Sequence, residues 1–318
     1  MTIARKYLID YSQTCYYHCM SRCVDQRFLL SKYTENERGK SYRQDWIERR
    51  LLLLGDVFAI DLLSFAVMDN HIHSVLHINF AQAEALSSIE VLKRWSRVGK
   101  VSLLCQVYME SNWREGLTEG QLSQVLEEVA VYRNKLCDIS TFMSKLNSYI
   151  AHRANKEDGR KGHFWDSRFK SQALLDAQAV LACMAYVDLN PIRAGKARSL
   201  KTSPHTSIKR RLLNSSKAEN SHLLPFSFSF VKTSRTIVEH ISLGEYVSFI
   251  KTVLSAKAQK SCEHLAFAER NDNWITVVLE FETVTNYAAG EAEFVYHFEK
   301  QIRRNNQKKT TAIQTLVR

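Results

Sequence analysis

The chain has 318 residues, of which 45% are hydrophobic, so it can bury a sizeable core. Its 44 lysine and arginine residues outnumber its 33 aspartate and glutamate residues, and the formal net charge of +11 favours polyanionic partners, nucleic acid before membrane. No apolar run approaches the roughly 18 residues of a transmembrane helix, and the first residues lack the apolar core of a signal peptide. We therefore expect a cytoplasmic protein with no membrane partner.

The first predicted elements are a strand, a helix and a hairpin. The strand covers residues 14–24, which are rich in aromatic and small side chains, and the helix covers residues 42–55, where apolar residues recur at helical spacing. Residues 58–68 and 71–78 are apolar runs joined by Asp69-Asn70, and these are good hairpin-turn residues. The predicted order is therefore β-α-β-β.

The first strand also contains Cys15, Cys19 and Cys23, three of the seven cysteines in the chain. Four strand residues span about 13 Å, which is too far for these thiolates to share one metal ion. We assign them to core packing, and the odd cysteine count is typical of reduced thiols.

Residues 79–138 are predicted to be helical and charged, with helices near 83–104 and 119–136 and without a site-like cluster. An amphipathic helix follows over residues 138–153, where Asp138 is a suitable N-cap. This region connects the hairpin to the remaining part of the sheet.

The aromatic and basic residues 163–175 predict the final strand of the sheet. Asp176 then caps a helix that runs to Asn190 and is ended by Pro191. Together the elements predict an α+β fold, in which helices cover one face of a small antiparallel sheet of ferredoxin type.

Two histidines just after the hairpin turn are the first candidate site. Alternate strand residues point to one face, so His71 and His73 should lie side by side, about 6 to 7 Å apart. Two neutral imidazoles in this position can chelate one divalent cation. The alternative is a pair of surface histidines on a half-exposed strand, and the pair needs a third ligand to make a metal site.

The helix over residues 176–190 offers such a partner. Its apolar stripe should face the sheet and consists of Val180, Cys183, Met184 and Val187. Tyr186 and Asn190 lie one turn apart on the flank of this stripe. A tyrosine hydroxyl, with an ordinary pKa of about 10, can attack a phosphodiester when a cation polarises the phosphate, and Asn190 can add an oxygen ligand. Otherwise Tyr186 is a core-edge residue with a hydrogen-bonded hydroxyl.

Four motifs occur in an order that resembles one known family. They are YYHCMSR at residues 16–22, VMDNHIHSVLH at 67–77, GHFWDSRFKS at 162–171 and YVDLNPIRAG at 186–195. The series resembles that of REP-associated tyrosine transposases, a branch of the single-tyrosine HUH transposases. The resemblance covers roughly residues 10–212, and four ordered motifs are more specific than any one of them.

The resemblance implies a role for each site residue and a ferredoxin-like HUH nuclease core. By resemblance, His71 and His73 bind Mg²⁺ or Mn²⁺, and Tyr186 attacks DNA to form a 5′-phosphotyrosine and a free 3′-OH. Related enzymes commonly have Gln as a third ligand at the position of Asn190, which is one methylene shorter. The family often has proline at the position of Asp69, so this chain carries an extra negative charge near the metal.

The expected domain organisation follows from the same motifs. Residues 1–212 should form the transposase domain, with a helical insertion at about 80–137. The composition changes beyond about residue 200, so we expect residues 213–318 to be an extension of unknown role. It ends in a basic tail that begins near residue 300, and the last dozen or so residues are expected to be disordered.

Basic residues interleaved with aromatic residues predict the DNA surface, since cations follow phosphates while rings stack on unpaired bases. The predicted DNA contacts are Arg22, Arg27, Arg168, Lys170, Arg193, Lys209, Arg210 and Arg211. The last three form a secondary patch, which can equally be a solvated helix face. We assign Trp165 to the core.

The sequence therefore predicts a metal-dependent nuclease and strand transferase acting on single-stranded or hairpin DNA, with repeated palindromes as the expected target. A homodimer is also considered. The alternatives are a relaxase or replication initiator, which would have a large helicase region, and a non-catalytic DNA-binding regulator of the same fold. A small-molecule hydrolase would need metal ligands that the sequence does not place.

Overall fold

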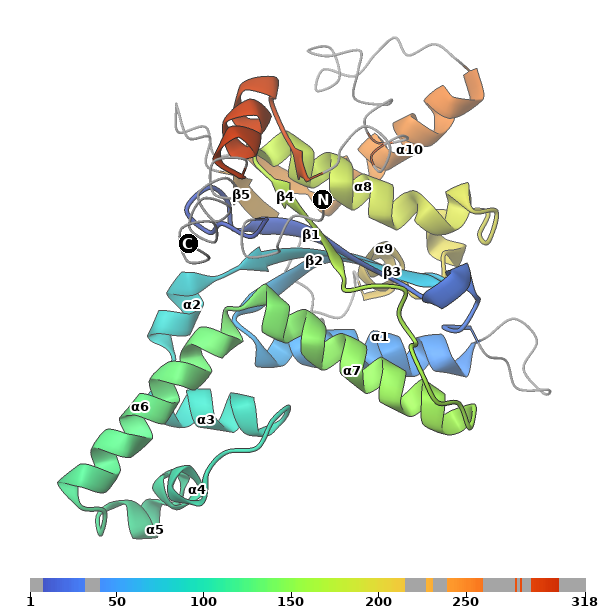
Figure 1. The fold of residues 1–318 in the computed structure, drawn as a ribbon. Coiled ribbons are helices and arrows are strands. Elements are labelled where there is room, and N and C mark those ends of the chain that lie inside the picture. Colours follow the sequence, from blue (N-terminus) through green and yellow to red (C-terminus); the bar gives the residue numbers. More distant parts are fainter. Residues whose placement is uncertain are drawn as a thin grey trace, which may run out of the picture.

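The structure is a computed structural model, and it describes residues 8–31, 41–214, 227–230, 239–259, 278, 281 and 287–302. A five-stranded sheet has the strand order β2-β3-β1-β4-β7 (Figure 1). Its strands are β1 (Tyr16–Arg22), β2 (Ile60–Val67), β3 (His71–Ile78), β4 (Lys170–Leu174) and β7 (Ala288–Ala289). The first four strands pair antiparallel, and β7 adds a parallel pair beside β4.

Helices connect and cover these strands. They are α1 (Tyr42–Val57), α2 (Phe80–Ala85), α3 (Ser88–Ser96), α4 (Leu103–Met109), α5 (Ser111–Arg114), α6 (Glu119–Leu136), α7 (Ile139–Glu157), α8 (Ala177–Arg193), α9 (Ser207–Asn214) and α10 (Leu243–Gln259), followed by a helix over residues 292–302. Short 3₁₀ turns cover Val24–Gln26 and Leu200–Thr202, and β5 (Ser227–Phe230) pairs with β6 (Glu239–Ser242). The predicted caps Asp138 and Asp176 accept hydrogen bonds from the first turns of α7 and α8.

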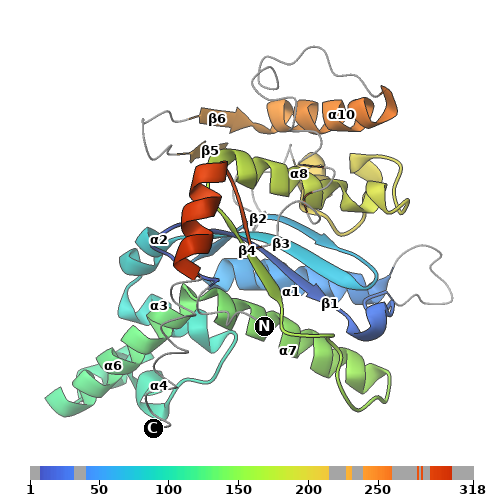
Figure 2. The same cartoon turned by 45° about the horizontal axis from the view of Figure 1, so that its top comes forward.

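The predicted hairpin and α+β class are confirmed, with one correction to the layers. Helices α1 and α7 cover one face of the sheet, whereas α8 covers the other (Figures 1 and 2). Both faces are apolar: Ile72 and Leu76 of β3 pack toward α1 and α7, and Val75 packs toward α8. A sheet that is apolar on both sides must be covered on both sides, so the expectation of helices on one face is wrong.

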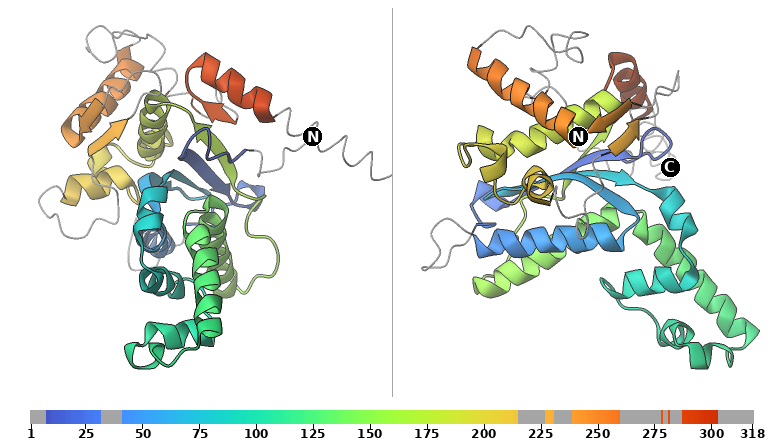
Figure 3. Two further views of the ribbon diagram at one scale, coloured as in Figure 1. Left: turned by 90° about the vertical axis from the view of Figure 1, so that its left-hand side faces the viewer. Right: turned by 180° about the vertical axis from the view of Figure 1, so that it is seen from behind.

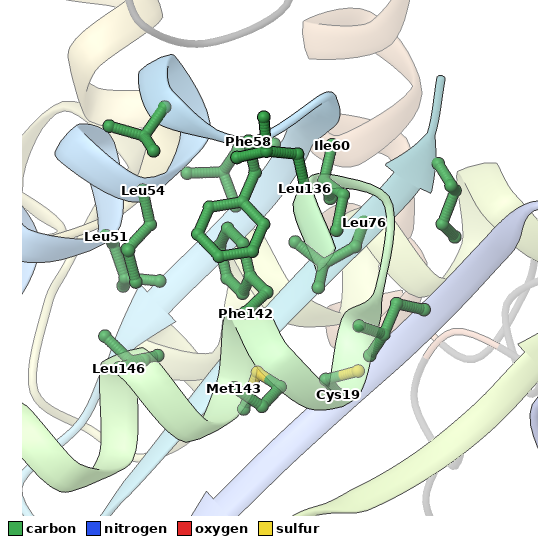
Figure 4. Packing of buried hydrophobic residues seen from close by; sticks show 14 of the residues in the cluster. Cys19, Leu51, Leu54, Phe58, Ile60, Leu76, Leu136, Phe142, Met143 and Leu146 are labelled. Carbon is green, nitrogen blue, oxygen red and sulfur yellow. The ribbon is translucent and has the colours of Figure 1, made fainter. Parts of the chain in front are cut away.

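The larger core lies between the sheet and helices α1 and α7. Figure 4 shows Leu51, Leu54 and Phe58 facing Phe142 and Leu146 across this layer. The rings of Phe58 and Phe142 meet edge to face, with centroids 5.3 Å apart. This packing holds α7 against the sheet and gives it a defined outer surface.

The insertion is helical, as predicted, but it is divided into shorter helices than expected. Ser87 and Ser102 cap α3 and α4, so the helix predicted near 83–104 is interrupted. Helices α3 to α6 form an arm that projects away from the sheet (Figures 1 and 3). None of the helices within the described ranges is long and apolar enough to cross a membrane.

Two predicted boundaries change. Strand β4 begins only at Lys170, and the preceding segment is irregular apart from a bridge between Cys23 and Trp165. Helix α8 continues past Pro191 to Arg193. In the last helical turn a proline removes a single amide donor, and the helix stops where Gly195 adopts a φ of 69°.

The described parts of the C-terminal segment pack on this core. Strand β7 joins the sheet, and Tyr246 of α10 donates a 2.7 Å hydrogen bond to Asp188 of α8. The last dozen or so residues, which were expected to be disordered, lie outside the described residues.

Candidate active site between β3 and α8

The two hairpin histidines lie on the face of β3 that α8 covers. The ring centroids of His71 and His73 are 4.8 Å apart, and the rings are nearly perpendicular. His71 is half-buried at the start of the strand, where its Nδ1 lies 2.6 Å from the Asn70 side-chain oxygen, whereas His73 is fully buried. Because that oxygen is an acceptor, Nδ1 of His71 carries the proton and Nε2 carries the lone pair.

Helix α8 brings Tyr186 to the same place. Its ring meets the His73 ring edge to face, with centroids 5.6 Å apart. The guanidinium carbon of Arg193, two turns along the helix, lies 4.8 Å from the centroid of the Tyr186 ring. The fold thus unites a tyrosine, two imidazoles and a cation from elements that are far apart in sequence.

A third histidine joins this group, and sequence analysis missed it. His18 of β1 places Nε2 at 2.9 Å from Nδ1 of His73, and Nδ1 at 3.0 Å from the Gln172 side-chain oxygen. With neutral rings, the Gln172 oxygen accepts from His18 Nδ1, so His18 Nε2 accepts from His73 Nδ1. This relay leaves His73 with its lone pair on Nε2, the tautomer that can ligate a metal ion there.

Electrostatics reinforce the neutral form of His73. Burial, together with the nearby His71, His18, Arg22 and Arg193, holds the pKa of His73 well below its usual range. A neutral imidazole is the form that binds metal ions. The residues present therefore fit a divalent cation held by His71 and His73.

A residue of the C-terminal segment closes the site. The ring of Phe281 stacks against Tyr186, with centroids 5.7 Å apart, and approaches the edge of His18 at 6.0 Å. Phe281 is fully buried, and Tyr186 retains only 3% of its exposure. Sequence analysis could not find this contact, because the extension carries no motif that indicates where it packs.

Asn190 lies one turn beyond Tyr186 on α8 and is 8% exposed. Its role as a metal ligand stays a prediction. The extra charge of Asp69 is compensated, because its carboxylate lies 2.6 Å from Nζ of Lys196, just after α8. Asp69 thus ties the hairpin turn to the end of the helix that carries Tyr186.

The predicted DNA contacts divide into three groups. Arg22 pairs with His71 across β1 and β3, and Arg193 covers Tyr186, so both lie beside the histidines. Arg27, Arg168 and Lys170 are exposed, as a DNA contact requires. Their contact with DNA stays a prediction.

The patch predicted at residues 209–211 needs correction. Arg211 is buried, donates a 2.6 Å hydrogen bond to the Leu63 carbonyl and lies near Asp188. Arg210 forms an ion pair with Glu48 at 2.5 Å, and Lys209 is partly buried. Helix α9 packs on β2 and buries Arg211, which removes that residue from the predicted DNA surface. Lys209 and Arg210 stay partly exposed, and their contact with DNA stays a prediction.

A second cluster of metal-type ligands lies elsewhere. Side-chain donor atoms of Asp45, Glu48 and His205 lie within 4.8 Å of one another. His205 Nδ1 is 2.9 Å from Glu48, which also holds Arg210. Burial disfavours the ionised form of Glu48, but hydrogen bonds from His205 and Arg210 outweigh it and lower its pKa. Glu48 is therefore already held by a histidine and an arginine, and Asp45 lies 3.7 Å from Nδ1 of the same histidine.

Comparisons with known proteins yielded one structural likeness. No family model and no curated protein matches the chain. A solved structure, "Structure of the REP associates tyrosine transposase bound to a REP hairpin", is similar over 68% of this chain and 87% of that chain, with 13% identity and a TM-score of 0.38. At this identity and score the likeness transfers neither a residue role nor an activity.

Proposed function

We propose that this protein is a metal-dependent DNA strand-cleaving and strand-transferring enzyme with Tyr186 as its nucleophile. The observation that carries this proposal is the meeting of Tyr186 with His71 and His73 at one face of the sheet. A core tyrosine can pack against one histidine in any protein. Two adjacent imidazoles, one held by a buried relay, are a more specific arrangement and suit a divalent cation.

The reaction would balance as a phosphoryl transfer. The Tyr186 oxygen forms a bond to phosphorus, the bond between phosphorus and O3′ breaks, and O3′ leaves as a hydroxyl. The proton lost by the phenol equals the proton that O3′ gains. Strand transfer is the reverse attack, by a 3′-hydroxyl on the 5′-phosphotyrosine.

Each residue would have a distinct part in that step. His71 and His73 would hold Mg²⁺ or Mn²⁺, which when bound polarises the phosphate and stabilises the leaving oxygen. Arg193 lies over the Tyr186 ring, where a positive charge favours the phenolate and attracts the phosphate. Asn190 is proposed as an oxygen ligand one helical turn from the nucleophile.

The proposed substrate is single-stranded or hairpin DNA, including repeated palindromes. The positive charge of the chain and the exposed cations Arg27, Arg168 and Lys170 support this choice. Residues 1–212 are proposed as the domain that carries the chemistry, while the extension contributes Phe281 to the site.

Covalent capture tests the proposal. The protein is incubated with an end-labelled hairpin that has single-stranded flanks, in Mg²⁺ or Mn²⁺ and in EDTA. A labelled band at the mass of protein plus DNA on a denaturing gel is expected only with metal. Absence of that adduct across a set of hairpin sequences, with DNA binding retained, would contradict enzymatic cleavage.

The second candidate is a DNA-binding regulator without catalysis. The burial of Tyr186 beneath Phe281 favours it, because little of the tyrosine is open to a substrate in this conformation. The same experiment separates the two: a regulator binds hairpin DNA but leaves it uncut. A relaxase or replication initiator would share the chemistry and differ in its DNA target.

A further inference from the structure

The outer surface of α1 and α7 carries a basic groove on the sheet face opposite Tyr186. The groove has a volume of about 750 Å³. Its basic lining residues are Arg50, Lys145, His152, Arg153 and Lys156, and the remaining lining residues are Ser144, Ser148 and Tyr149. No acidic residue lines it. An opening of this size with one sign of charge focuses the field of its cations outward.

The cations follow the axis of α7 in a regular stripe. Lys145, His152 and Lys156 recur at intervals that keep them on one side of the helix. The stripe from Lys145 to Lys156 is about 16 Å long, since an α-helix rises about 1.5 Å per residue. This length matches the rise of about five base pairs of a duplex.

Aromatic rings hold the two arginines of the groove in place. The guanidinium of Arg50 lies 4.6 Å from the centroid of Tyr149, and that of Arg153 lies 4.6 Å from the centroid of Trp46. Arg153 also donates a 2.8 Å hydrogen bond to the Tyr149 hydroxyl. Stacked guanidinium groups lose little freedom when they bind, and their edges present N–H groups suited to phosphate oxygens.

The crowded charges are poorly neutralised by the protein itself. Burial, with Arg50 and Lys135 nearby, lowers the pKa of Lys145. Within the part of the chain that the structure describes, no carboxylate lies within ion-pair distance of Arg50, Lys145 or Lys156. Glu157 lies at the end of the stripe, 3.6 Å from Nε of Arg153. An external anion would relieve this repulsion.

A second groove lies beside the first, along the segment that leads from α7 to β4. It shares Ser144 and passes along the segment from Gly162 to Phe169, which includes the exposed Arg168. This segment connects α7 to β4 at the side of the sheet (Figure 1). The lining of this second groove carries Asp166 as well as Arg168, so the cationic stripe itself ends on α7.

We propose that the α1–α7 groove binds the sugar–phosphate backbone of duplex DNA, as a site separate from the one that cleaves. The choice of DNA rests on the proposed function. A duplex fits better than a single strand, because single-strand sites need exposed rings for base stacking. Here the ring of Tyr149 is occupied by Arg50 and Trp46.

An anionic membrane is the less suitable partner. Membrane surfaces are held by apolar side chains inserted beside the basic ones. The exposed large apolar residues in the described ranges lie elsewhere, as in Leu103 of α4, Trp113 of α5 and Leu126 of α6. The surface of α1 and α7 contributes none of them.

The arm provides a matched control for charge. Residues 80–137, which comprise the arm and α2, contain seven basic and seven acidic residues, so the surplus of +11 lies outside them. Lys93 and Lys100 are exposed there. The double variant Lys93→Gln/Lys100→Gln removes the same charge as Lys145→Gln/Lys156→Gln without touching the groove.

The test measures binding of a labelled blunt duplex of about 20 base pairs to the full-length protein by fluorescence anisotropy, in EDTA, over a salt series. Lys145→Gln/Lys156→Gln should bind roughly tenfold or more weakly at moderate salt, and its log–log salt slope should fall by about two. The arm variant should match the unmodified protein. Circular dichroism and the melting temperature confirm that both variants fold.

Other outcomes overturn the proposal. Equal weakening of both variants would indicate a general charge effect, and an unchanged affinity of the groove variant would remove the groove from DNA binding. If vesicles of phosphatidylserine and phosphatidylcholine lose affinity for the groove variant while the duplex does not, the groove is a membrane site. Adduct formation on single-stranded DNA reports separately on Tyr186, so the two proposals fail independently.

Discussion

Nε2 of His18 lies 2.9 Å from Nδ1 of His73, and this contact joins two neighbouring strands beneath the candidate nucleophile. The hydrogen bond orients the His73 ring and places its lone pair on Nε2. Such second contacts of a metal ligand usually change metal affinity by about 10- to 100-fold. His18 is therefore a positioning residue for the proposed metal site.

The first prediction concerns that contact. His18→Leu should weaken Mn²⁺ binding by about 10- to 100-fold, because His73 loses the acceptor that fixes its tautomer. His18→Gln should recover part of the loss, since its amide oxygen can accept the same hydrogen bond. Electron paramagnetic resonance of free Mn²⁺ measures both. His77→Gln is the control, because His77 lies on β3 together with His73 but its ring bonds to Asp61. Equal affinities in all variants would contradict the relay.

The second prediction concerns the nucleophile. Tyr186→Phe should abolish the covalent adduct and leave DNA and Mn²⁺ binding within about twofold, because it removes only the hydroxyl. Tyr149→Phe is the matched control, since Tyr149 also lies late in an amphipathic helix but is stacked under Arg50. Peptide mapping of the adduct identifies the tyrosine. A nucleotide on Tyr149, or an adduct from Tyr186→Phe, would show that the assignment is wrong.

The third prediction concerns the cover over the nucleophile. Phe281→Leu should speed adduct formation in single-turnover experiments, because a smaller side chain stacks less fully on Tyr186. Phe142→Leu is the control: it replaces another fully buried aromatic ring, in the core between the sheet and helices α1 and α7, with a smaller side chain. It should lower stability without speeding adduct formation. Both variants should lose a few kcal/mol at most, as for other core truncations. Slower adduct formation in Phe281→Leu alone would indicate that Phe281 positions Tyr186 for attack.

The fourth prediction concerns pH and the network around Glu48. A carboxylate whose folded pKa is lowered contributes stability above its ordinary pKa of about 4.3, and this contribution is lost as the pH falls through the folded pKa. Glu48→Gln should therefore cost about 1 to 3 kcal/mol at neutral pH, and the cost should shrink in acid. Urea unfolding of both proteins at neutral and at acidic pH measures this difference in stability.

The effect of Mn²⁺ on the stability of Glu48→Gln shows whether the cluster of Asp45, Glu48 and His205 is an ion-pair network or a metal site. If the cluster is an ion-pair network, the free energy of unfolding should differ between the unmodified protein and Glu48→Gln by the same amount in EDTA and in Mn²⁺. If Mn²⁺ stabilises only the unmodified protein, Asp45, Glu48 and His205 form a metal site. That result would contradict the assignment of Arg210 as the partner of Glu48.

The sequence by itself determined the features that depend on short-range rules. Two-residue alternation placed His71 and His73 on one face, and the Asp69-Asn70 turn set their hairpin. The caps Asp138 and Asp176 marked the starts of two helices because side-chain capping acts within three residues. These interactions involve neighbours in the chain, so a local pattern records them.

The tertiary structure decided which distant residues meet. It placed α8 on the opposite face from α1 and α7, joined Gln172 to His18, covered Tyr186 with Phe281 and buried Arg211 near Asp188. A local pattern shows that a residue is apolar, basic or aromatic, but its partner is selected by packing of the whole chain. That selection made His18 part of the candidate site and removed Arg211 from the DNA surface, because burial depends on which faces are brought together.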